Sequence, residues 1–236
     1  MFDYLREYVA MESAKHECQF GRAATLAEGL TNRQAELNRI SPFLGYEPYP
    51  AYGPEWEAKR LRQLAEKTGS ATGQLVAVLP EVARARTDPF DDGRFERWQA
   101  SHFNDSGWKS LRTTRGWEDQ GFIDAQGHAY RGVMWYQLTV DLPADAAGKS
   151  LWLFAPAVVN EAWVWVNGRY AGHRAHTMPW FRPHPVELEI TSMVQPGHRN
   201  QITLRVLNNI DVFGVSGIYE RMFIYARTLT SGNPSQ

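Results

Sequence analysis

The sequence is short of cysteine, of long apolar runs and of net charge, and each shortage excludes a class of protein. A single cysteine, Cys18, excludes an internal disulfide and leaves the redox compartment open. No run of about 18 apolar residues occurs, which argues against a membrane-spanning helix. The 25 Lys plus Arg residues nearly match the 26 Asp plus Glu residues, for a formal net charge of −1. We therefore expect neither nucleic acid nor a membrane among the partners, because nucleic-acid-binding proteins usually present a basic face.

The opening residues contain acids and lack the basic-then-apolar pattern of a secretory signal. We expect no signal peptide in this chain, and a piece cut from a longer periplasmic or secreted bacterial protein is an open alternative. The 236 residues are enough for one large domain with an appendage. A chain of this length buries enough apolar surface to fold without disulfides or metals.

The first third of the chain differs in composition from the rest, since eight of the nine tryptophans lie after residue 97. Residues 1–40 contain no proline or tryptophan and few β-branched residues, which predicts helix. Thr31 and Gln34 have the spacing of a capping box, so we expect a second helix to begin at Thr31. A third helix should open at Pro54 and end at Gly69. We therefore predict a helical appendage over residues 1–72.

From residue 74 onward the hydrophobic period changes from 3.6 to 2. Residues 133–142 alternate most clearly, and the dipeptide Asn167-Gly168 predicts a tight hairpin because both residues tolerate positive φ. Further short strands are expected at residues 82–86, 151–154, 161–166, 169–173, 186–190, 202–206 and 218–225. About eight short strands without intervening helices indicate a mainly β fold, an antiparallel β-sandwich over residues 73–227. Residues 228–236 are expected to form a frayed tail.

The β half also resembles a known family. The segments DSGWKSL, GWEDQGF, VMWYQLTVDLP, EAWVWVNGRYAGH, MPWF, GHRNQITLRVLNN and GIYERMFI follow one another in order. Together they resemble the N-terminal sugar-binding domain of glycoside hydrolase family 2 over residues 85–227. That domain is a jelly roll of the galactose-binding-like group, whereas residues 1–70 resemble no family that we recognise. The resemblance implies a carbohydrate partner and a catalytic domain elsewhere in the parent protein. The family's catalytic glutamates lie on a separate barrel of about 250 residues, for which this chain has no room.

Strand alternation predicts which end of the sandwich binds a ligand. Every second connection lies at the same end, so residues 124–132, 155–160, 174–180 and 208–216 should gather there. These connections are longer than those at the opposite end, and binding loops usually cluster in this way. The resemblance implies that this end also faces the catalytic barrel.

A sugar needs an aromatic plate under its C–H face and polar groups around its hydroxyl rim. We predict carbohydrate binding by residues of these loops and of a neighbouring one: Trp117, Glu118, His128, Tyr130, Arg131, His176, Trp180, Asn209, Asp211 and Phe213. The alternative for each aromatic residue is that it caps the core. No catalytic residue is predicted.

Two sets of residues have some features of a metal site. His173, His176 and His184 lack nearby cysteines or a regular helix to set zinc spacing, so we predict no metal site there. Asp88, Asp91 and Asp92 offer oxygen ligands, which leaves a structural calcium ion open. Otherwise we expect no cofactor.

Three functions remain in competition. The leading one is a non-catalytic carbohydrate-binding module of a glycoside hydrolase or a polysaccharide-degrading protein. The second is a structural sandwich that positions a missing catalytic domain. The third, a stand-alone enzyme, needs two carboxylates facing each other across a sugar. Glu187 and Glu189 share one face of one strand and are expected to be solvated charges instead.

Overall fold

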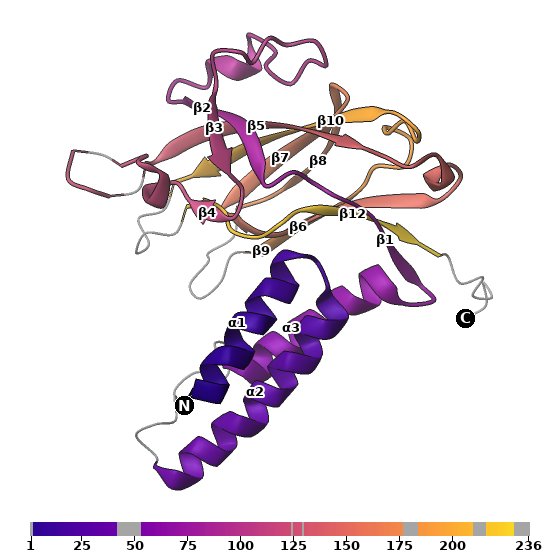
Figure 1. Ribbon diagram of the computed structural model, residues 1–236. Coiled ribbons are helices and arrows are strands. Elements are labelled where there is room, and N and C mark those ends of the chain that lie inside the picture. The colour runs from indigo at the N-terminus through magenta and orange to yellow at the C-terminus, as the bar shows by residue number, and fades with distance from the viewer. Residues whose placement is uncertain are drawn as a thin grey trace, which may run out of the picture. The chain divides into compact units, whose positions relative to one another are not determined.

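The computed structural model describes residues 2–41, 53–123, 125–128, 130–176, 184–209 and 216–228. The chain divides into two compact units, Met1–Gln74 and Leu75–Gln236, which are described separately (Figure 1).

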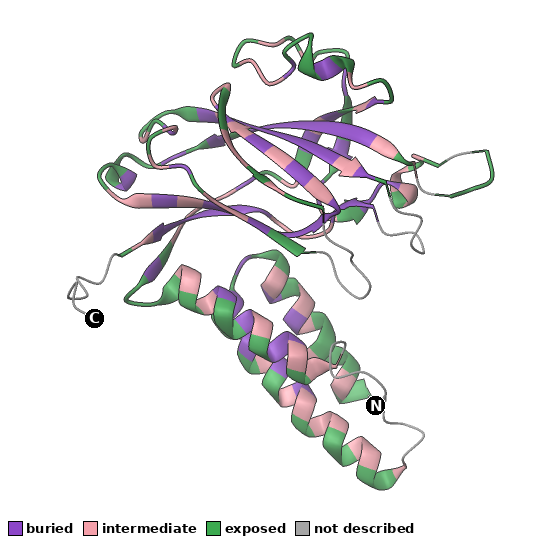
Figure 2. Cartoon of the chain, turned by 180° about the vertical axis from the view of Figure 1, so that it is seen from behind, coloured by how far each residue is buried: buried purple, intermediate pink, exposed green. Residues whose placement is uncertain are grey.

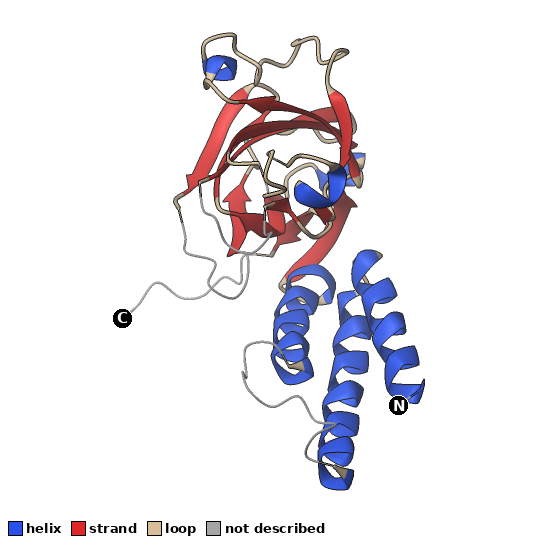
Figure 3. Ribbon diagram, turned by 90° about the vertical axis from the view of Figure 1, so that its left-hand side faces the viewer, coloured by secondary structure: helices blue, strands red, loops and turns tan. Residues whose placement is uncertain are grey.

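The described residues of the first unit form three helices, α1 (Phe2–His16), α2 (Phe20–Ile40) and α3 (Pro54–Gly69). Figure 3 shows them side by side, with α2 packed against both α1 and α3. Their shared core is built mostly of small and aliphatic side chains, including Met11, Ala27 and Leu61. Bidentate ion pairs with N–O distances of 2.7 Å join Arg33 to Glu7 and Arg62 to Glu28. Among the described helices, none has both the length and the hydropathy that crossing a membrane requires.

The expected start of the second helix at Thr31 is wrong. Thr31 lies inside α2, where its hydroxyl donates to the Ala27 carbonyl at 3.0 Å. The break between α1 and α2 falls earlier, where Cys18 adopts a positive φ of 57°. Neither glycine nor proline marks this break, so the composition gave no signal for it. The third helix begins at Pro54 and ends at Gly69, as predicted.

The second unit is an antiparallel β-sandwich, which confirms the predicted fold class. Sheet A contains, in order, β1 (Gly73–Val78), β12 (Phe223–Arg227), β6 (Ser150–Val159), β11 (Gly217–Ile218) and β4 (Arg115–Gly116), with β9 (His184–Glu189) also paired to β6. Sheet B contains, in order, β3 (Lys109–Arg112), β2 (Val82–Asp88), β5 (Gly132–Asp141), β10 (Arg199–Asn208), β7 (Glu161–Val166) and β8 (Arg169–Arg174). The strands of both sheets are coloured red in Figure 3.

The core lies between the two sheets, and most residues of the central strands are buried (Figure 2). Met134, Tyr136 and Leu138 of β5 face inward, as do Ala162 and Val164 of β7. Each large apolar side chain buried in this way contributes roughly 1.5–3 kcal/mol. Asn167 and Gly168 form the turn between β7 and β8 with φ values of 51° and 76°, as the hairpin prediction requires.

A second apolar cluster lies on the outer face of sheet B and accounts for several of the tryptophans. Trp98 and Trp108, from the connection between β2 and β3, pack with Trp135 of β5. Trp165 of β7 stacks on Trp135 with ring centroids 5.3 Å apart. The neighbouring Trp163 lies between His173, at 4.7 Å, and the Arg205 guanidinium, at 4.1 Å.

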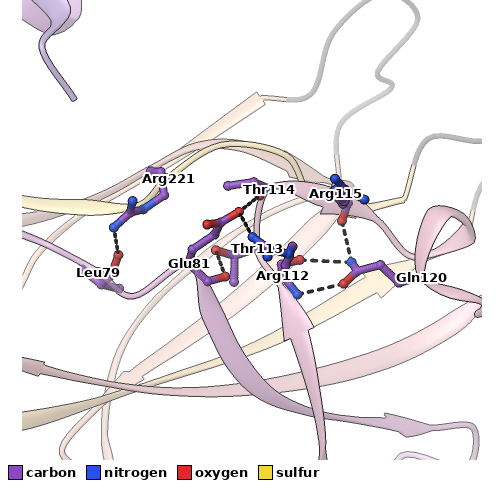
Figure 4. Close-up of polar contacts among 8 residues, drawn as sticks. All are labelled: Leu79, Glu81, Arg112, Thr113, Thr114, Arg115, Gln120 and Arg221. Atoms are coloured by element: carbon purple, nitrogen blue, oxygen red, sulfur yellow. Dashed lines mark hydrogen bonds and ion pairs between the residues drawn. The ribbon is translucent and has the colours of Figure 1, made fainter. Parts of the chain in front are cut away.

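The chain passes from sheet B to sheet A between β3 and β4, and two side chains hold this crossing (Figure 4). The Gln120 amide accepts the backbone N–H of Arg112 at 2.8 Å and donates to the carbonyls of Arg112 and Arg115. The Glu81 carboxylate accepts hydrogen bonds from Arg112 and from the Thr114 hydroxyl. Within a sheet, backbone N–H and C=O groups bond a neighbouring strand. At this crossing, side chains bond some of these backbone groups instead.

Candidate ligand-binding loop end

Strand register brings four chain segments to one end of the sandwich, which we call the loop end. Gly132 at the start of β5 pairs with Asn208 at the end of β10. Leu207 pairs with Glu161 at the start of β7, and Ala162 pairs with Arg174 at the end of β8. The described residues directly before β5 and β7 and directly after β8 and β10 therefore lie at the loop end.

One of these connections is much shorter than expected. We predicted a loop over residues 155–160, but β6 continues to Val159 and only Asn160 separates it from β7. A register shift between Ala155 and Val158 accommodates the turn from sheet A to sheet B. The apolar run through Val158 and Val159 is buried on this strand, which explains why it does not form a loop.

Asn160 is the central polar residue of the described loop end. It is fully buried, its backbone N–H donates to the Leu207 carbonyl at 3.1 Å, and its amide nitrogen lies 2.9 Å from Nδ1 of His176. The Arg174 guanidinium donates to the carbonyls of Asn160 and Val158, each at 2.7 Å. Burial lowers the pKa of Arg174 from its ordinary value, while the charge of Glu161 opposes this shift. These contacts hold the exposed His176 beside the corner between β6 and β7.

Tyr130 and Asn208 form the neighbouring part of the loop end. The Asn208 amide donates to the Tyr130 carbonyl at 3.4 Å, and the Tyr130 hydroxyl donates to the Val133 carbonyl at 3.3 Å. Tyr130 is half-buried, and its burial raises the pKa of its hydroxyl. Gly132 has a φ of 142°, and a Cβ there would lie 2.5 Å from the Tyr130 hydroxyl. Glycine at 132 therefore leaves room for this ring.

Trp117 belongs to the core, and the next residue, Glu118, is half-buried. Trp117 is fully buried, its indole N–H donates to the Tyr136 hydroxyl, and its ring lies 5.8 Å from that of Tyr130. The Glu118 carboxylate accepts hydrogen bonds from the hydroxyls of Ser216 and Tyr219. Burial is the main reason why the pKa of Tyr219 is raised well above its ordinary value. Glu118 therefore links the end of β4 to the residues on either side of β11, whereas the Trp117 side chain packs in the core.

The remaining predicted site residues divide into two groups. His128, Arg131 and Asn209 are exposed on segments that enter or leave the loop end. Trp180, Asp211 and Phe213 lie outside the described residues. The sequence did not point to Arg174, which donates to the Asn160 carbonyl, or to Asn208, which donates to the Tyr130 carbonyl. The available signal for Asn208 was an asparagine two residues after the alternating segment 202–206.

The candidate metal ligands have other partners. Nε2 of His173 lies 2.6 Å from the Glu161 carboxylate, and Asp91 forms an ion pair with Arg205 at 2.8 Å. Asp88 accepts the backbone N–H groups of Asp92 and Gly93. Over the described ranges, no group of three or more His, Cys, Asp or Glu residues is arranged to hold a metal ion.

Glu187 is not the solvated charge that we expected. It is half-buried, and its carboxylate accepts hydrogen bonds from the Tyr225 hydroxyl and, at 2.7 Å, from Arg227. The guanidinium of Arg227 also lies 3.8 Å from the centroid of the Trp152 ring. Alternation predicted the face of Glu187 but not these cross-strand partners.

Known proteins include two relatives with significant sequence similarity to this chain. None of the known family models matches the chain. A β-glucuronidase of Paenibacillus borealis is 29% identical over 133 residues, which cover 56% of this chain and 21% of that enzyme. A β-glucuronidase of Formosa agariphila is 24% identical over 119 residues, which cover 47% of this chain and 12% of that enzyme.

Solved structures agree with these relatives at the level of the fold. The crystal structure of Ruminococcus gnavus β-glucuronidase has a TM-score of 0.57 and 19% identity, covering 68% of this chain and 30% of that chain. The same values hold for its complex with D-glucuronic acid. The resemblance of the sandwich to the N-terminal domain of glycoside hydrolase family 2 is thereby confirmed. The chain spans about a fifth of the first of these curated relatives.

Proposed function

We propose that this chain is a non-catalytic carbohydrate-binding domain of a glycoside hydrolase, and that its loop end contacts the sugar. The observation that supports this most is the partial match to β-glucuronidases, which is 21% of one enzyme and 30% of another. One of these relatives is solved in complex with D-glucuronic acid. Uronic acids and their glycosides are therefore the first ligands to test.

The chemistry of the loop end supports a sugar ligand. His176 and Arg131 supply an exposed imidazole and an exposed guanidinium, and the buried amides of Asn160 and Asn208 lie behind them. Such groups bond the hydroxyls and the carboxylate of a uronic acid. The half-buried ring of Tyr130 offers an aromatic surface beside them. Trp180, Asp211 and Phe213 remain proposed contacts on the strength of the sequence.

A second candidate function is a purely structural domain that positions a catalytic partner. The buried Trp117 and the bonded carboxylate of Glu118 favour it, because two of the predicted contacts serve the fold itself. The two functions differ in whether the isolated chain binds sugar at all.

A glycan array on the full chain, followed by calorimetry with D-glucuronic acid, tests the proposal. Charged or amide groups contribute about 1–3 kcal/mol each to bonding neutral hydroxyls. We therefore expect weak binding, with a Kd between about 1 μM and 1 mM. The Asp211→Ala substitution should weaken this binding by about 10- to 100-fold and leave the melting temperature unchanged, because the sequence predicts a loop carboxylate there and substitutions outside the core rarely affect stability.

Trp163→Ala is the matched control for the loop end. Trp163 packs between His173 and Arg205 on the outer face of sheet B, so its loss should lower the melting temperature and leave affinity nearly intact. The opposite result, in which Trp163→Ala abolishes binding without loss of stability, would place the site on the sheet face. Failure of the wild-type chain to bind any glycan would favour the structural role.

A further inference from the structure

The connection between β2 and β3 presents two phenylalanines to solvent. Phe90 is 82% exposed and Phe95 is 85% exposed, on either side of a short 3-10 turn at Asp92–Arg94. They are the most exposed large hydrophobic side chains among the described residues of the sandwich unit. Single exposed apolar residues are ordinary on protein surfaces, but two large rings that flank one short turn indicate a contact surface. We call residues 89–95 the aromatic tip.

The backbone of the aromatic tip is firmly held. The Asp88 carboxylate accepts the N–H groups of Asp92 at 2.8 Å and Gly93 at 3.0 Å, and the indole N–H of Trp135 at 2.8 Å. A Cβ at Gly93 would lie 2.6 Å from the Trp98 ring, so the turn is packed directly on the aromatic cluster. The fixed turn therefore keeps the two phenylalanines outside the core. Because the backbone is already ordered, its conformational entropy changes little when a ligand binds.

The charges at the tip balance in number, since Asp91 and Asp92 are matched by Arg94 and by Arg205 of β10. The Asp91 carboxylate lies 2.8 Å from Arg205, whose side chain is 7% exposed, and 3.2 Å from Arg94. The Glu96 carboxylate accepts the indole N–H of Trp98 at 2.7 Å. The surface that the tip offers is therefore two apolar rings among compensated charges, which does not select a strongly charged partner.

The size of the tip argues for a small ligand face rather than a protein. An aromatic side chain buries about 150–250 Å², so two rings supply about 300–500 Å². A stable protein interface buries about 800 Å² on each partner. The C–H face of a pyranose matches one ring in size and polarity. Asp88 pairs with Val133 beside Gly132, so the tip also begins at the loop end.

We propose that the aromatic tip is a second carbohydrate contact, in which Phe90 and Phe95 stack on sugar units further along a polysaccharide. This inference rests on the proposed function, because the loop end must hold one part of the same chain. The tip then favours a polymer over a monosaccharide, because only a polymer can contact the loop end and the aromatic tip at the same time.

Calorimetry with two probes on the full chain tests this. The F90A/F95A double variant should bind soluble glucuronoxylan about 10-fold or more weakly than the wild type, because it loses both ring contacts. Its affinity for D-glucuronic acid should stay within about twofold, and its melting temperature should not change. Tyrosine at both positions keeps the rings and should restore binding to the polymer.

Phe2→Ala is the matched control, since Phe2 is 88% exposed on α1 in the other unit and should leave both affinities unchanged. If the wild type binds both probes and F90A/F95A binds the polymer equally well, the inference is wrong. It is also wrong if the double variant only shifts the oligomeric state, because the rings then serve a protein interface. If the wild type binds neither probe, the proposed function fails first.

Discussion

Glycine at position 217 satisfies two separate constraints. Its φ is 89°, and a Cβ there would lie 2.7 Å from Cδ1 of Trp117. We expect Gly217→Ala to cost about 3 kcal/mol or more of unfolding free energy, because a left-handed backbone and an overpacked indole add. Urea denaturation followed by tryptophan fluorescence measures this loss.

Gly121 is the control that isolates the cost of the backbone conformation from the cost of the close contact. It has a similar φ of 85°, and a Cβ there would meet nothing within 4 Å. Gly121→Ala should therefore cost only about 1–2 kcal/mol, the backbone contribution alone. Equal losses for the two variants would show that the close approach to Trp117 contributes nothing.

Buried tyrosines should make the fold sensitive to alkali. Burial is the main cause that raises the pKa values of Tyr136, Tyr219 and Tyr225 above the ordinary value of about 10. The folded state thus keeps protons that the unfolded state releases, so this stabilisation is present below about pH 10 and lost above it. Tyrosinate absorbance and circular dichroism, followed together through an alkaline titration, should show these three tyrosines ionising only as the sandwich unfolds. Full ionisation of all tyrosines with the sheet signal intact would contradict this account.

At the residue scale, the sequence predicted which face a side chain takes but not its partner. The alternation of β5 and β7 placed the inward residues correctly. Glu118 was expected at a ligand, yet it bonds Ser216, 98 residues away in the sequence. A pairing at that separation depends on how β4 and β11 meet, which local pattern does not encode.

Elements with strong local chemistry were predicted well. Pro54 opens α3 because its fixed φ suits a first helical turn, and Asn167-Gly168 closes the β7–β8 hairpin. The boundary between α1 and α2 was missed because Cys18, an unlikely residue for a positive φ, ends the first helix.

Gln120 should be essential for the crossing from β3 to β4. Its amide bonds backbone groups of Arg112 and Arg115 (Figure 4). It also lies 3.2 Å from the Gly116 carbonyl. With about 0.5–1.5 kcal/mol for each bond, Gln120→Ala should destabilise the fold by about 3 kcal/mol. Hydrogen exchange should then be faster at the Arg112 amide, which loses its acceptor.

The adjacent Asp119 is the control, because it lies on the same short turn. Asp119→Ala should change stability by less than about 0.5 kcal/mol. Gln120→Glu keeps the acceptor and loses the donor, so it should fall between the two. A neutral Gln120→Ala would mean that the crossing is held by Glu81 alone.

For the whole molecule, we expect no hydrolysis of glycosides. A glycosidase needs two carboxylates about 5–9.5 Å apart across the scissile bond. Glu118 and Glu187 instead have their carboxylates bonded to hydroxyls or arginine. Incubation with an aryl β-D-glucuronide should release no aryl alcohol above background. Steady turnover that Glu118→Gln abolishes would overturn this expectation.

The sandwich as a whole was predictable because its strands alternate and its turns have distinct chemistry. The position of the loop end was predictable, because strand direction determines which connections lie at the same end of the sandwich. Its contacts were not predictable. Asn160, Arg174 and His176 come together at the turn between β6 and β7, and the apolar sequence of β6 gives no sign that the chain turns there.

Nuclear magnetic resonance with a bound sugar tests the central claim most directly. On titration of the isotope-labelled full chain with D-glucuronic acid, the side-chain amides of Asn160 and Asn208 and the ring of His176 should shift saturably. The indole signal of Trp163, on the outer face of sheet B, should stay in place. Shifts confined to Trp163 and its neighbours, or no saturable shifts with any sugar that a glycan array selects, would contradict a carbohydrate-binding loop end.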